Sequence, residues 1–311
     1  MYYRLIPFSR SFDTYGLIYQ SPNFISAGTF VQISLRNVKE WAIIVEEVNI
    51  KNIDYDISNI REIEEIYENI IFLSLIQLKI ILFVSQYYIV PIHHALALFF
   101  PRNLKEKIQK QTVHKIKPSI FSYKIANIQL SLEQESIYKK IQDTTQNKHL
   151  IYGVTWSGKT QIYMKIIEEN LKSWRQTLLL IPEIILTSQI GERVIEVFWK
   201  DVIILHSGVS PAKKSQYWMD IYSWNAKIVI GTRSSLFYPY NNLWAIIIDE
   251  EHDESYISDA APRYHTLDVA EKISELSEIP LILGSWTPRV STFYRALQWE
   301  FQLLQLLEKF K

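Results

Sequence analysis

From about residue 128 onward, short apolar runs alternate with amphipathic stretches along the chain. The runs are HLIYGV, TLLLIP, VIILHS, KIVIGT, WAIIIDE and LILGS, and the amphipathic stretches begin near residues 159, 187, 211 and 265. Strands that are apolar on both faces and alternate with helices are typical of a parallel sheet covered on both sides, with right-handed crossovers. We therefore predict an α/β domain over residues 128–311.

The pattern before that point is different and predicts a small β-rich unit followed by helix. FVQISL (30–35) and WAIIVEEV (41–48) are joined by the polar RNVKE, which predicts a hairpin. An apolar-periodic stretch predicts a helix from about 61 to 88, and Pro91 and Pro101 follow it. These residues define a predicted first domain, 1–101.

A basic segment, 102–127, is the predicted boundary between the two domains. Its first part, 102-RNLKEKIQKQTVHKIK-117, carries six Lys/Arg against one Glu. Two interpretations stay open for it: a solvated linker or a strip that faces DNA.

Composition excludes several classes of protein. The 311 residues have zero net charge, so there is no global attraction to nucleic acid, and there is no cysteine for disulfides or thiolate metal sites. The N-terminus lacks the apolar core of a signal peptide. The apolar stretch 70–84 is too short to span a membrane and contains Gln77 and Lys79. We expect a cytoplasmic protein without a membrane partner.

The stretch 153-GVTWSGKT-160 follows a predicted strand and precedes a predicted helix, which is the context of a phosphate-binding loop. In such a loop backbone N–H groups and a lysine surround phosphate oxygens. The candidate nucleotide-binding residues are Gly153, Ser157, Gly158, Lys159 and Thr160. Trp156 is a bulky side chain within this loop.

A second charged motif, 249-DEEH-252, ends the run WAIII, ninety residues after Lys159. The carboxyl ends of parallel strands share one edge of a sheet, so the two motifs are predicted to meet. Thr160 and Asp249 would hold Mg²⁺, and Lys159 would contact the β/γ-phosphates of ATP. Glu250 would orient or deprotonate the attacking water, and His252 would be a coupling residue.

Other residues near predicted strand ends are candidates for ligand contacts. Arg233 and Ser234 follow KIVIGT and suit contacts with the phosphates of a nucleic-acid strand. Upstream, 131-SLEQ-134 has two interpretations: Gln134 completes a helix capping box, or it reads adenine. Spacing alone favours the capping box.

Together these motifs resemble the first helicase lobe of the PriA family, the replication-restart helicases of superfamily 2. The resemblance runs in order through Gln134, GVTWSGKT, PEIILTSQ, LHSG, IGTRSSLF, IIIDEEHDESY, PRYH and LGSWTP. It implies a RecA-like, ATP- and Mg²⁺-dependent lobe of a 3′-to-5′ DNA helicase that recognises stalled forks and assists primosome assembly. Single-stranded-DNA-binding protein and other primosome proteins are the partners that it implies.

The N-terminal part resembles that family's domain for the 3′ end of a nascent DNA strand. On this resemblance Phe12 and Asp13 would contact the terminal nucleotide, although core packing is an equal interpretation for Phe12. The family's aromatic-rich loop, which couples DNA to ATP hydrolysis, corresponds to residues 255–265. Its candidate DNA-binding residues are Tyr256, Arg263, Tyr264 and His265.

The sequence also departs from the family pattern. No winged-helix domain separates the two predicted domains, and the second helicase lobe and the cysteine-rich zinc region do not occur before Lys311. We expect this chain to bind DNA and nucleotide but to hydrolyse ATP poorly and not to unwind DNA by itself, because the arginines of a second lobe complete the site. The alternatives are a non-catalytic fork-binding or assembly protein, and an unrelated phosphate-loop enzyme such as a small-molecule kinase.

Tryptophan (nine residues) outnumbers glycine (eight) in this sequence. Eight of the tryptophans occupy positions where the resemblance to the PriA family implies glycine or another small residue: Trp41, Trp156, Trp174, Trp199, Trp224, Trp244, Trp286 and Trp299. Only Trp218, on an amphipathic helix, resembles a native tryptophan. Our hypothesis is that UGA codons, read as glycine in the organism, were translated as tryptophan.

The gene's codons test this hypothesis. We expect UGA at the eight positions and UGG at Trp218. UGG codons at the eight positions would refute it.

Overall fold

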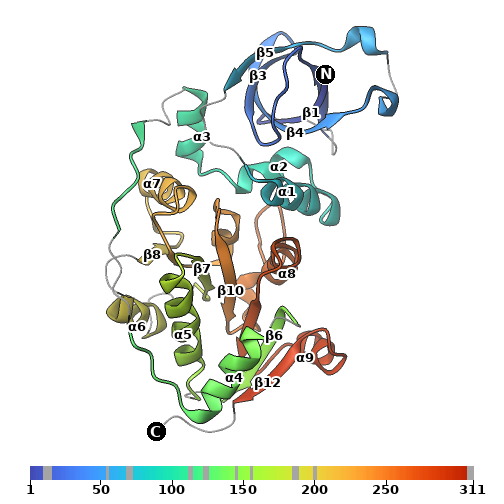
Figure 1. Ribbon diagram of the computed structural model, residues 1–311. Helices are drawn as coiled ribbons and strands as arrows, with labels where there is room; N and C mark the ends of the chain where they lie inside the picture. Colours follow the sequence, from blue (N-terminus) through green and yellow to red (C-terminus); the bar gives the residue numbers. More distant parts are fainter. Residues whose placement is uncertain are drawn as a thin grey trace. The chain divides into compact units, whose positions relative to one another are not determined.

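The chain folds into two units, seen here in a computed structural model (Figure 1). The structure describes residues 1–9, 16–53, 56–67, 73–110, 115–121, 126–143, 146–154, 157–183, 189–198 and 202–306. Unit 1 comprises Met1–Lys117 with Ala260–Arg263, and unit 2 comprises Pro118–Asp259 with Tyr264–Lys311. The division near residue 117 falls inside the basic segment 102–127.

Unit 1 contains an antiparallel sheet with the strand order β2-β1-β4-β3-β5. The strands are β1 (Tyr2–Pro7), β2 (Leu17–Gln20), β3 (Phe30–Leu35), β4 (Val38–Val48) and β5 (Ile63–Tyr67). The predicted hairpin is confirmed: β3 and β4 pair directly, and Arg36 and Asn37 form the turn with φ of 51° and 63°. Aromatic rings of Phe8, Phe30 and Phe100 pack together beside this sheet.

Three helices follow the sheet of unit 1: α1 (Leu75–Tyr87), α2 (Ile92–Leu98) and α3 (Arg102–Gln109). The prediction of one helix from 61 to 88 is wrong in its first part, where β5 pairs with the edge of β3. The helix begins at Leu75 because Ser74 and Gln77 form a capping box that satisfies its first N–H groups.

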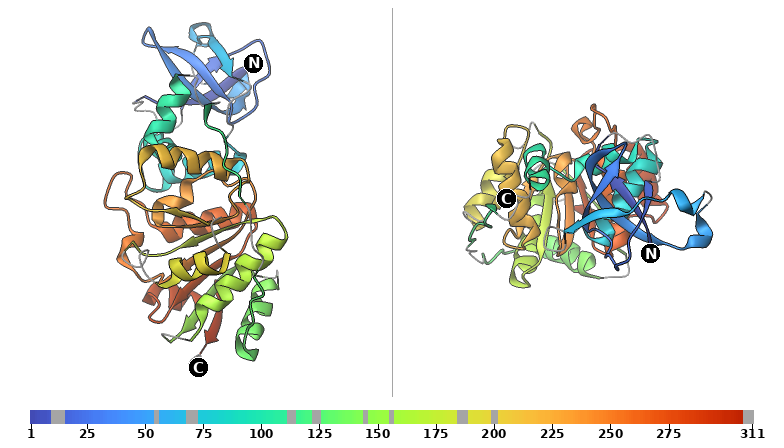
Figure 2. Two further views of the ribbon diagram at one scale, coloured as in Figure 1. Left: turned by 90° about the vertical axis from the view of Figure 1, so that its left-hand side faces the viewer. Right: turned by 90° about the horizontal axis from the view of Figure 1, so that it is seen from above.

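Unit 2 contains a parallel sheet with the strand order β12-β6-β11-β10-β7-β9-β8. Figure 2 shows the ribbon from two further sides. Its strands are β6 (Lys148–Gly153), β7 (Gln176–Leu180), β8 (Val202–Leu205), β9 (Ile228–Gly231), β10 (Leu243–Asp249), β11 (Leu281–Ser285) and β12 (Gln302–Leu306). Its helices are α4 (Leu132–Gln142), α5 (Lys159–Lys172), α6 (Gln189–Phe198), α7 (Pro211–Tyr222), α8 (Thr266–Ser277) and α9 (Val290–Leu297). The predicted α/β domain is confirmed, and α9 and β12 extend it.

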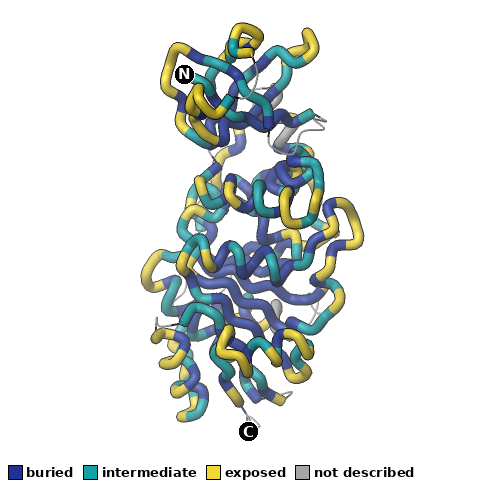
Figure 3. Tube along the Cα trace, turned by 90° about the vertical axis from the view of Figure 1, so that its right-hand side faces the viewer, coloured by how far each residue is buried: buried dark blue, intermediate teal, exposed yellow. Residues whose placement is uncertain are grey.

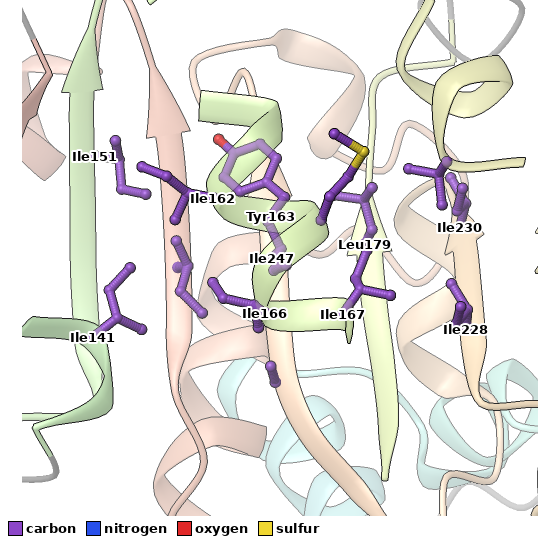
Figure 4. Close-up of a cluster of buried hydrophobic side chains, with 14 of the residues drawn as sticks. Ile141, Ile151, Ile162, Tyr163, Ile166, Ile167, Leu179, Ile228, Ile230 and Ile247 are labelled. Carbon is purple, nitrogen blue, oxygen red and sulfur yellow. The ribbon is translucent and has the colours of Figure 1, made fainter. Parts of the chain in front are cut away.

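The core of unit 2 explains why its strands are apolar on both faces. Helices α4, α5 and α6 lie over one face, where Ile151, Leu179 and Ile247 pack against Ile162 and Ile166 of α5 (Figure 4). The alternate strand residues, which point to the other face, are also buried, as Figure 3 shows for the strands as a whole. These buried strands carry the motifs of charged and small residues at their carboxyl ends.

Three of the eight unusual tryptophans lie in backbone conformations that favour glycine. Trp174, Trp224 and Trp299 have φ of 58°, 62° and 65°. Each directly follows the C-cap of a helix, namely α5, α7 and α9. This is the position at which helices commonly end with a glycine in the left-handed conformation. The geometry agrees with the glycine hypothesis at these three positions.

The other tryptophans behave differently. Trp41 and Trp244 lie inside strands β4 and β10, so their backbone conformation does not require glycine. Trp218 is fully buried on α7 and stacks on Tyr222, as a native tryptophan would. Two of the eight, Trp156 and Trp199, lie outside the described residues.

We expect Trp299→Gly to stabilise the protein by about 1 kcal/mol, because a non-glycine residue in the left-handed region costs roughly 1–2 kcal/mol. The Trp299 side chain is 85% exposed, so its removal loses little packing. Urea unfolding measures the change. Trp244→Gly is the matched control, since Trp244 is 40% exposed in a strand and glycine should destabilise there. Equal destabilisation by both changes would contradict the expectation.

Candidate nucleotide and DNA site

The phosphate loop lies between β6 and α5, as predicted. Gly153 ends the strand and Lys159 begins the helix. Gly158 is the N-cap with φ of 90°, a conformation that glycine adopts without strain. The N-terminus of α5 therefore points its free N–H groups into the loop, which is how such loops bind anions. Residues 155 and 156, and so Trp156, lie outside the described residues.

Two side chains of the loop are oriented toward a buried interior. The Lys159 ammonium donates a hydrogen bond of 2.9 Å to the carbonyl oxygen of Gly153. The Ser157 hydroxyl is buried and has no hydrogen-bond partner in the described part of the chain. A Cβ built on Gly153 would lie 2.7 Å from the Ser157 hydroxyl, so only glycine leaves this space free. The buried Lys159 ammonium, the Ser157 hydroxyl and the open space at Gly153 are together suited to binding the oxygens of a phosphate group.

Gln134 forms the capping box that its spacing predicts. Its side-chain oxygen accepts from Ser131 N at 2.9 Å, and the Ser131 hydroxyl accepts from Gln134 N at 3.3 Å. Its amide nitrogen also donates to the carbonyl oxygen of Gly158 at 3.4 Å. Gln134 is therefore a link between α4 and the phosphate loop, with both ends of its amide already engaged.

Asp249 lies at the carboxyl end of β10, beside the phosphate loop's helix. Its Oδ1 accepts a hydrogen bond of 2.9 Å from the hydroxyl of Tyr163 on α5. Burial, together with the neighbouring Glu250 charge, raises the pKa of Asp249 to about 6, although the Tyr163 hydrogen bond and the Lys159 charge act to lower it. The two predicted motifs are thus brought together, and a cation at Asp249 would favour its ionised form.

Glu250 has a left-handed backbone with φ of 48° directly after the strand. Burial raises the pKa of its carboxyl group, which suits a group that accepts a proton. Its Oε2 is buried without a hydrogen bond within the described residues, and His252 Nδ1 lies 3.6 Å away, too far for one. The raised pKa of Glu250 and its Oε2, which has no hydrogen bond among the described residues, are compatible with the predicted role of orienting or deprotonating the attacking water.

His252 contacts the next strand instead of the nucleotide loop. Its Nδ1 shares a hydrogen bond of 2.8 Å with the hydroxyl of Ser285, at the end of β11. The Ser285 hydroxyl also accepts from Thr287 N at 3.1 Å. The predicted coupling role of His252 is therefore directed at the segment LGSWTP.

The residues present fit a nucleotide with Mg²⁺. Thr160 is the second residue of α5, and Asp249 supplies a carboxylate on the adjoining strand. Among the described residues there is no cluster of three or more His, Asp or Glu that could hold a metal alone. This arrangement suits an ion that takes one or two protein oxygens and completes its shell with phosphate and water.

Glu251 forms a clamp that the sequence motifs did not indicate. Its buried carboxylate accepts from Arg289 N at 2.7 Å and from the Thr292 hydroxyl at 3.3 Å, at the start of α9. In return, the Arg289 guanidinium donates to the carbonyl oxygens of His252 and Asp253 at 3.5 and 3.3 Å. The DEEH segment and α9 are thus held together from both sides, by contacts that no sequence spacing reveals.

The short 3₁₀ turn η6 (Glu254–Tyr256) connects the nucleotide side to the predicted DNA loop. Arg233, from η5 (Arg233–Phe237), donates to the carbonyl oxygens of Ser255 and Ile257 at 2.7 and 2.8 Å. The buried Tyr256 hydroxyl lies 2.6 Å from the carbonyl oxygen of Asp249. The Tyr256 hydroxyl contacts only protein main chain among the described residues, and the side chain has almost no exposed surface for DNA.

The remaining predicted DNA-binding residues differ in exposure. Ser234 and Arg263 are exposed. Tyr264 is buried against Phe237, with ring centroids 5.0 Å apart. His265 is the N-cap of α8, where its Nδ1 accepts from Leu267 N, and burial lowers its pKa. Phe12 and Asp13 lie outside the described residues.

Comparison with protein families identifies the class of this chain. A profile of the DEAD/DEAH box helicase family matches residues 131–291, and a profile of a 3′ DNA-binding domain (3′BD) of PriA matches residues 6–101. The chain therefore belongs to the DEAD/DEAH box helicase family.

Among individual proteins, the chain is similar to replication restart protein PriA. It is 35% identical to PriA of Helicobacter pylori (strain J99) over 295 residues, 95% of this chain and 44% of that protein. It is 34% identical to PriA of Rickettsia prowazekii over 307 residues, 99% of this chain and 46% of that protein. The PriA resemblance is confirmed, and the chain spans less than half the length of these relatives.

Solved structures add a weak similarity. The helicase domain of Pyrococcus furiosus Hef is 22% identical with a TM-score of 0.44, covering 59% of this chain and 39% of that one. Over the residues that the structure describes, no helix has the length and apolar character needed to cross a membrane.

We expect Glu251→Ala to loosen α9, because it leaves Arg289 N and the Thr292 hydroxyl without their acceptor, at a cost of about 1–3 kcal/mol. Hydrogen exchange of the amides in α9 should accelerate roughly tenfold. The exposed Glu254, changed to alanine, is the control and should leave α9 unaffected. Unchanged exchange in Glu251→Ala would show that the clamp does not hold this helix.

Proposed function

We propose that this chain is the N-terminal portion of an ATP-dependent replication-restart DNA helicase that translocates 3′ to 5′, recognises stalled forks and assists primosome assembly. The observation that carries the proposal is the contact between the phosphate-loop helix and the DEEH motif, through Tyr163 and Asp249 at 2.9 Å. The match of residues 6–101 to a 3′ DNA-binding domain supports the assignment to DNA.

The residues divide the work of nucleotide binding and hydrolysis. Backbone N–H groups at Gly158 and the Ser157 hydroxyl would hold phosphate oxygens, and Lys159 would neutralise their charge. Thr160 and Asp249 would hold Mg²⁺, which when bound neutralises charge on the phosphates. Glu250 would orient the attacking water and take its proton, since burial gives it a raised pKa.

On the DNA side, exposed and buried residues have different proposed roles. Ser234 and Arg263 are exposed and suit contacts with the DNA backbone. We propose that Tyr256 and Tyr264, which are buried, act by coupling instead of by stacking on bases. Phe12 and Asp13 would contact the 3′ end of a nascent strand, as the PriA resemblance implies.

The proposed partners are forked and single-stranded DNA, with single-stranded-DNA-binding protein and primosome proteins as protein partners. The proposed site of action is the cytoplasm, where bacterial DNA replicates. Zinc, which the resemblance implies for longer family members, would need ligands other than cysteine in these 311 residues. For the 311 residues tested alone we expect slow hydrolysis, since arginines of a second lobe contribute about 10³–10⁵ in kcat in related sites.

We expect the Trp156→Gly form to bind ADP in the presence of Mg²⁺ at least tenfold more tightly than the chain as written, because glycine leaves the backbone of the loop open to phosphate. Fluorescence anisotropy of a labelled ADP measures both affinities. Lys159→Ala, in the Trp156→Gly background, is the control that should abolish binding.

Binding to a labelled fork with a 3′ nascent end, compared with blunt duplex, tests the DNA assignment. DNA-stimulated ATP hydrolysis then separates the candidates. Turnover in the Trp156→Gly form supports the helicase; fork binding with no turnover in either form favours the non-catalytic assembly protein. Nucleotide binding without any affinity for forks would contradict both and favour an unrelated phosphate-loop enzyme.

A further inference from the structure

Tyr163 is a fully buried side chain of α5 that the phosphate-loop motif does not include (Figure 4). It lies four residues after Lys159 and three after Thr160, so all three share one side of the helix. Its hydroxyl donates to Oδ1 of Asp249 at 2.9 Å. Through this hydrogen bond, Tyr163 links the helix that carries Thr160 directly to the strand that carries Asp249.

The space for this hydroxyl is provided by the neighbouring strand. In the parallel register Asp249 of β10 pairs with Gly284 of β11. A Cβ built on Gly284 would overlap the Tyr163 hydroxyl and would lie 3.1 Å from Asp249 Oδ1. Any larger residue at position 284 would therefore displace the hydroxyl from the carboxylate.

The Tyr163 hydroxyl is the donor in this hydrogen bond and the Asp249 carboxylate is the acceptor, because an ionised carboxylate has no proton to donate. The Tyr256 hydroxyl contacts the main-chain oxygen of Asp249 and not its carboxylate. Tyr163 therefore orients the carboxylate by holding its Oδ1.

We propose that Tyr163 is a positioning residue that orients the carboxylate of Asp249 toward the Mg²⁺ of the nucleotide, with Gly284 keeping the place of the Tyr163 hydroxyl open. This inference rests on the proposed function. A carboxylate held in one rotamer before the ion arrives loses less conformational entropy on binding, so Tyr163 contributes to Mg²⁺-dependent affinity and not to phosphate affinity as such.

The test uses Tyr163→Phe, which removes the hydroxyl and keeps the ring. Labelled ADP is titrated against the Trp156→Gly form of the 311-residue chain, with and without this change, once in Mg²⁺ and once in EDTA. We expect affinity to fall about tenfold in Mg²⁺ and to change less than twofold in EDTA. In an Asp249→Asn background the effect of Tyr163→Phe in Mg²⁺ should disappear, because the hydroxyl acts through that carboxylate.

Tyr19→Phe is the matched control. It also removes the hydroxyl of a buried tyrosine, which donates to Ser34 O at 2.6 Å in unit 1, and it should leave both affinities unchanged. Gly284→Ala is the second variant, and it should reproduce the Mg²⁺-specific loss by displacing the hydroxyl. Circular dichroism shows whether each variant is folded.

The outcomes separate the two proposals. If the parent form binds no nucleotide, the proposed function fails and this inference fails with it. If the parent binds and Tyr163→Phe weakens affinity equally in Mg²⁺ and EDTA, or in neither, only the positioning role is overturned.

Discussion

The constraint on which the rest of this structure depends is the parallel pairing of β6, β11 and β10. Parallel strands run in the same direction, so their carboxyl ends lie at one edge of the sheet. The pairing of Gly284 with both Ile151 and Asp249 therefore brings three separate strand ends together at that edge. The phosphate loop, the segment LGSWTP and the DEEH motif follow these ends. Their chemistry is assembled by main-chain hydrogen bonds between strands that are buried on both faces.

Burial then gives the acidic motif its properties. Asp249, Glu250 and Glu251 follow one another in the chain but have three different environments. Asp249 accepts a hydrogen bond from a tyrosine hydroxyl. Glu250 has one oxygen without a hydrogen bond among the described residues, and Glu251 accepts hydrogen bonds at the start of α9. Burial raises the pKa of all three carboxyl groups, yet only the first two face the phosphate loop's lysine as their main opposite charge.

The tryptophans show how backbone geometry can test a sequence hypothesis. Nine tryptophans beside eight glycines, with eight of the tryptophans at positions that suit small residues, led to the hypothesis of misread glycine codons. The structure adds an independent observation, because three of them follow helix C-caps with positive φ. Steric repulsion between Cβ and the carbonyl oxygen makes that conformation costly for an indole and free for glycine. Trp41 and Trp244 lie in strands without positive φ, so their backbone conformation does not favour glycine.

The alternation of buried strands and helices, the phosphate loop and the acidic motif can all be predicted from the sequence, because hydrophobic periodicity and loop spacing are local properties. The sequence also predicted the capping box of Gln134. It misplaced the start of α1, since edge pairing of β5 depends on a distant strand. Three features depend on the tertiary structure. They are the packing of the Tyr163 hydroxyl against Gly284, the hydrogen bond from Arg289 N to Glu251, and the burial of Tyr256. The contacts of Tyr163 with Asp249 and of Glu251 with Arg289 join residues 86 and 38 positions apart, and they depend on strand register and packing, which no local pattern records.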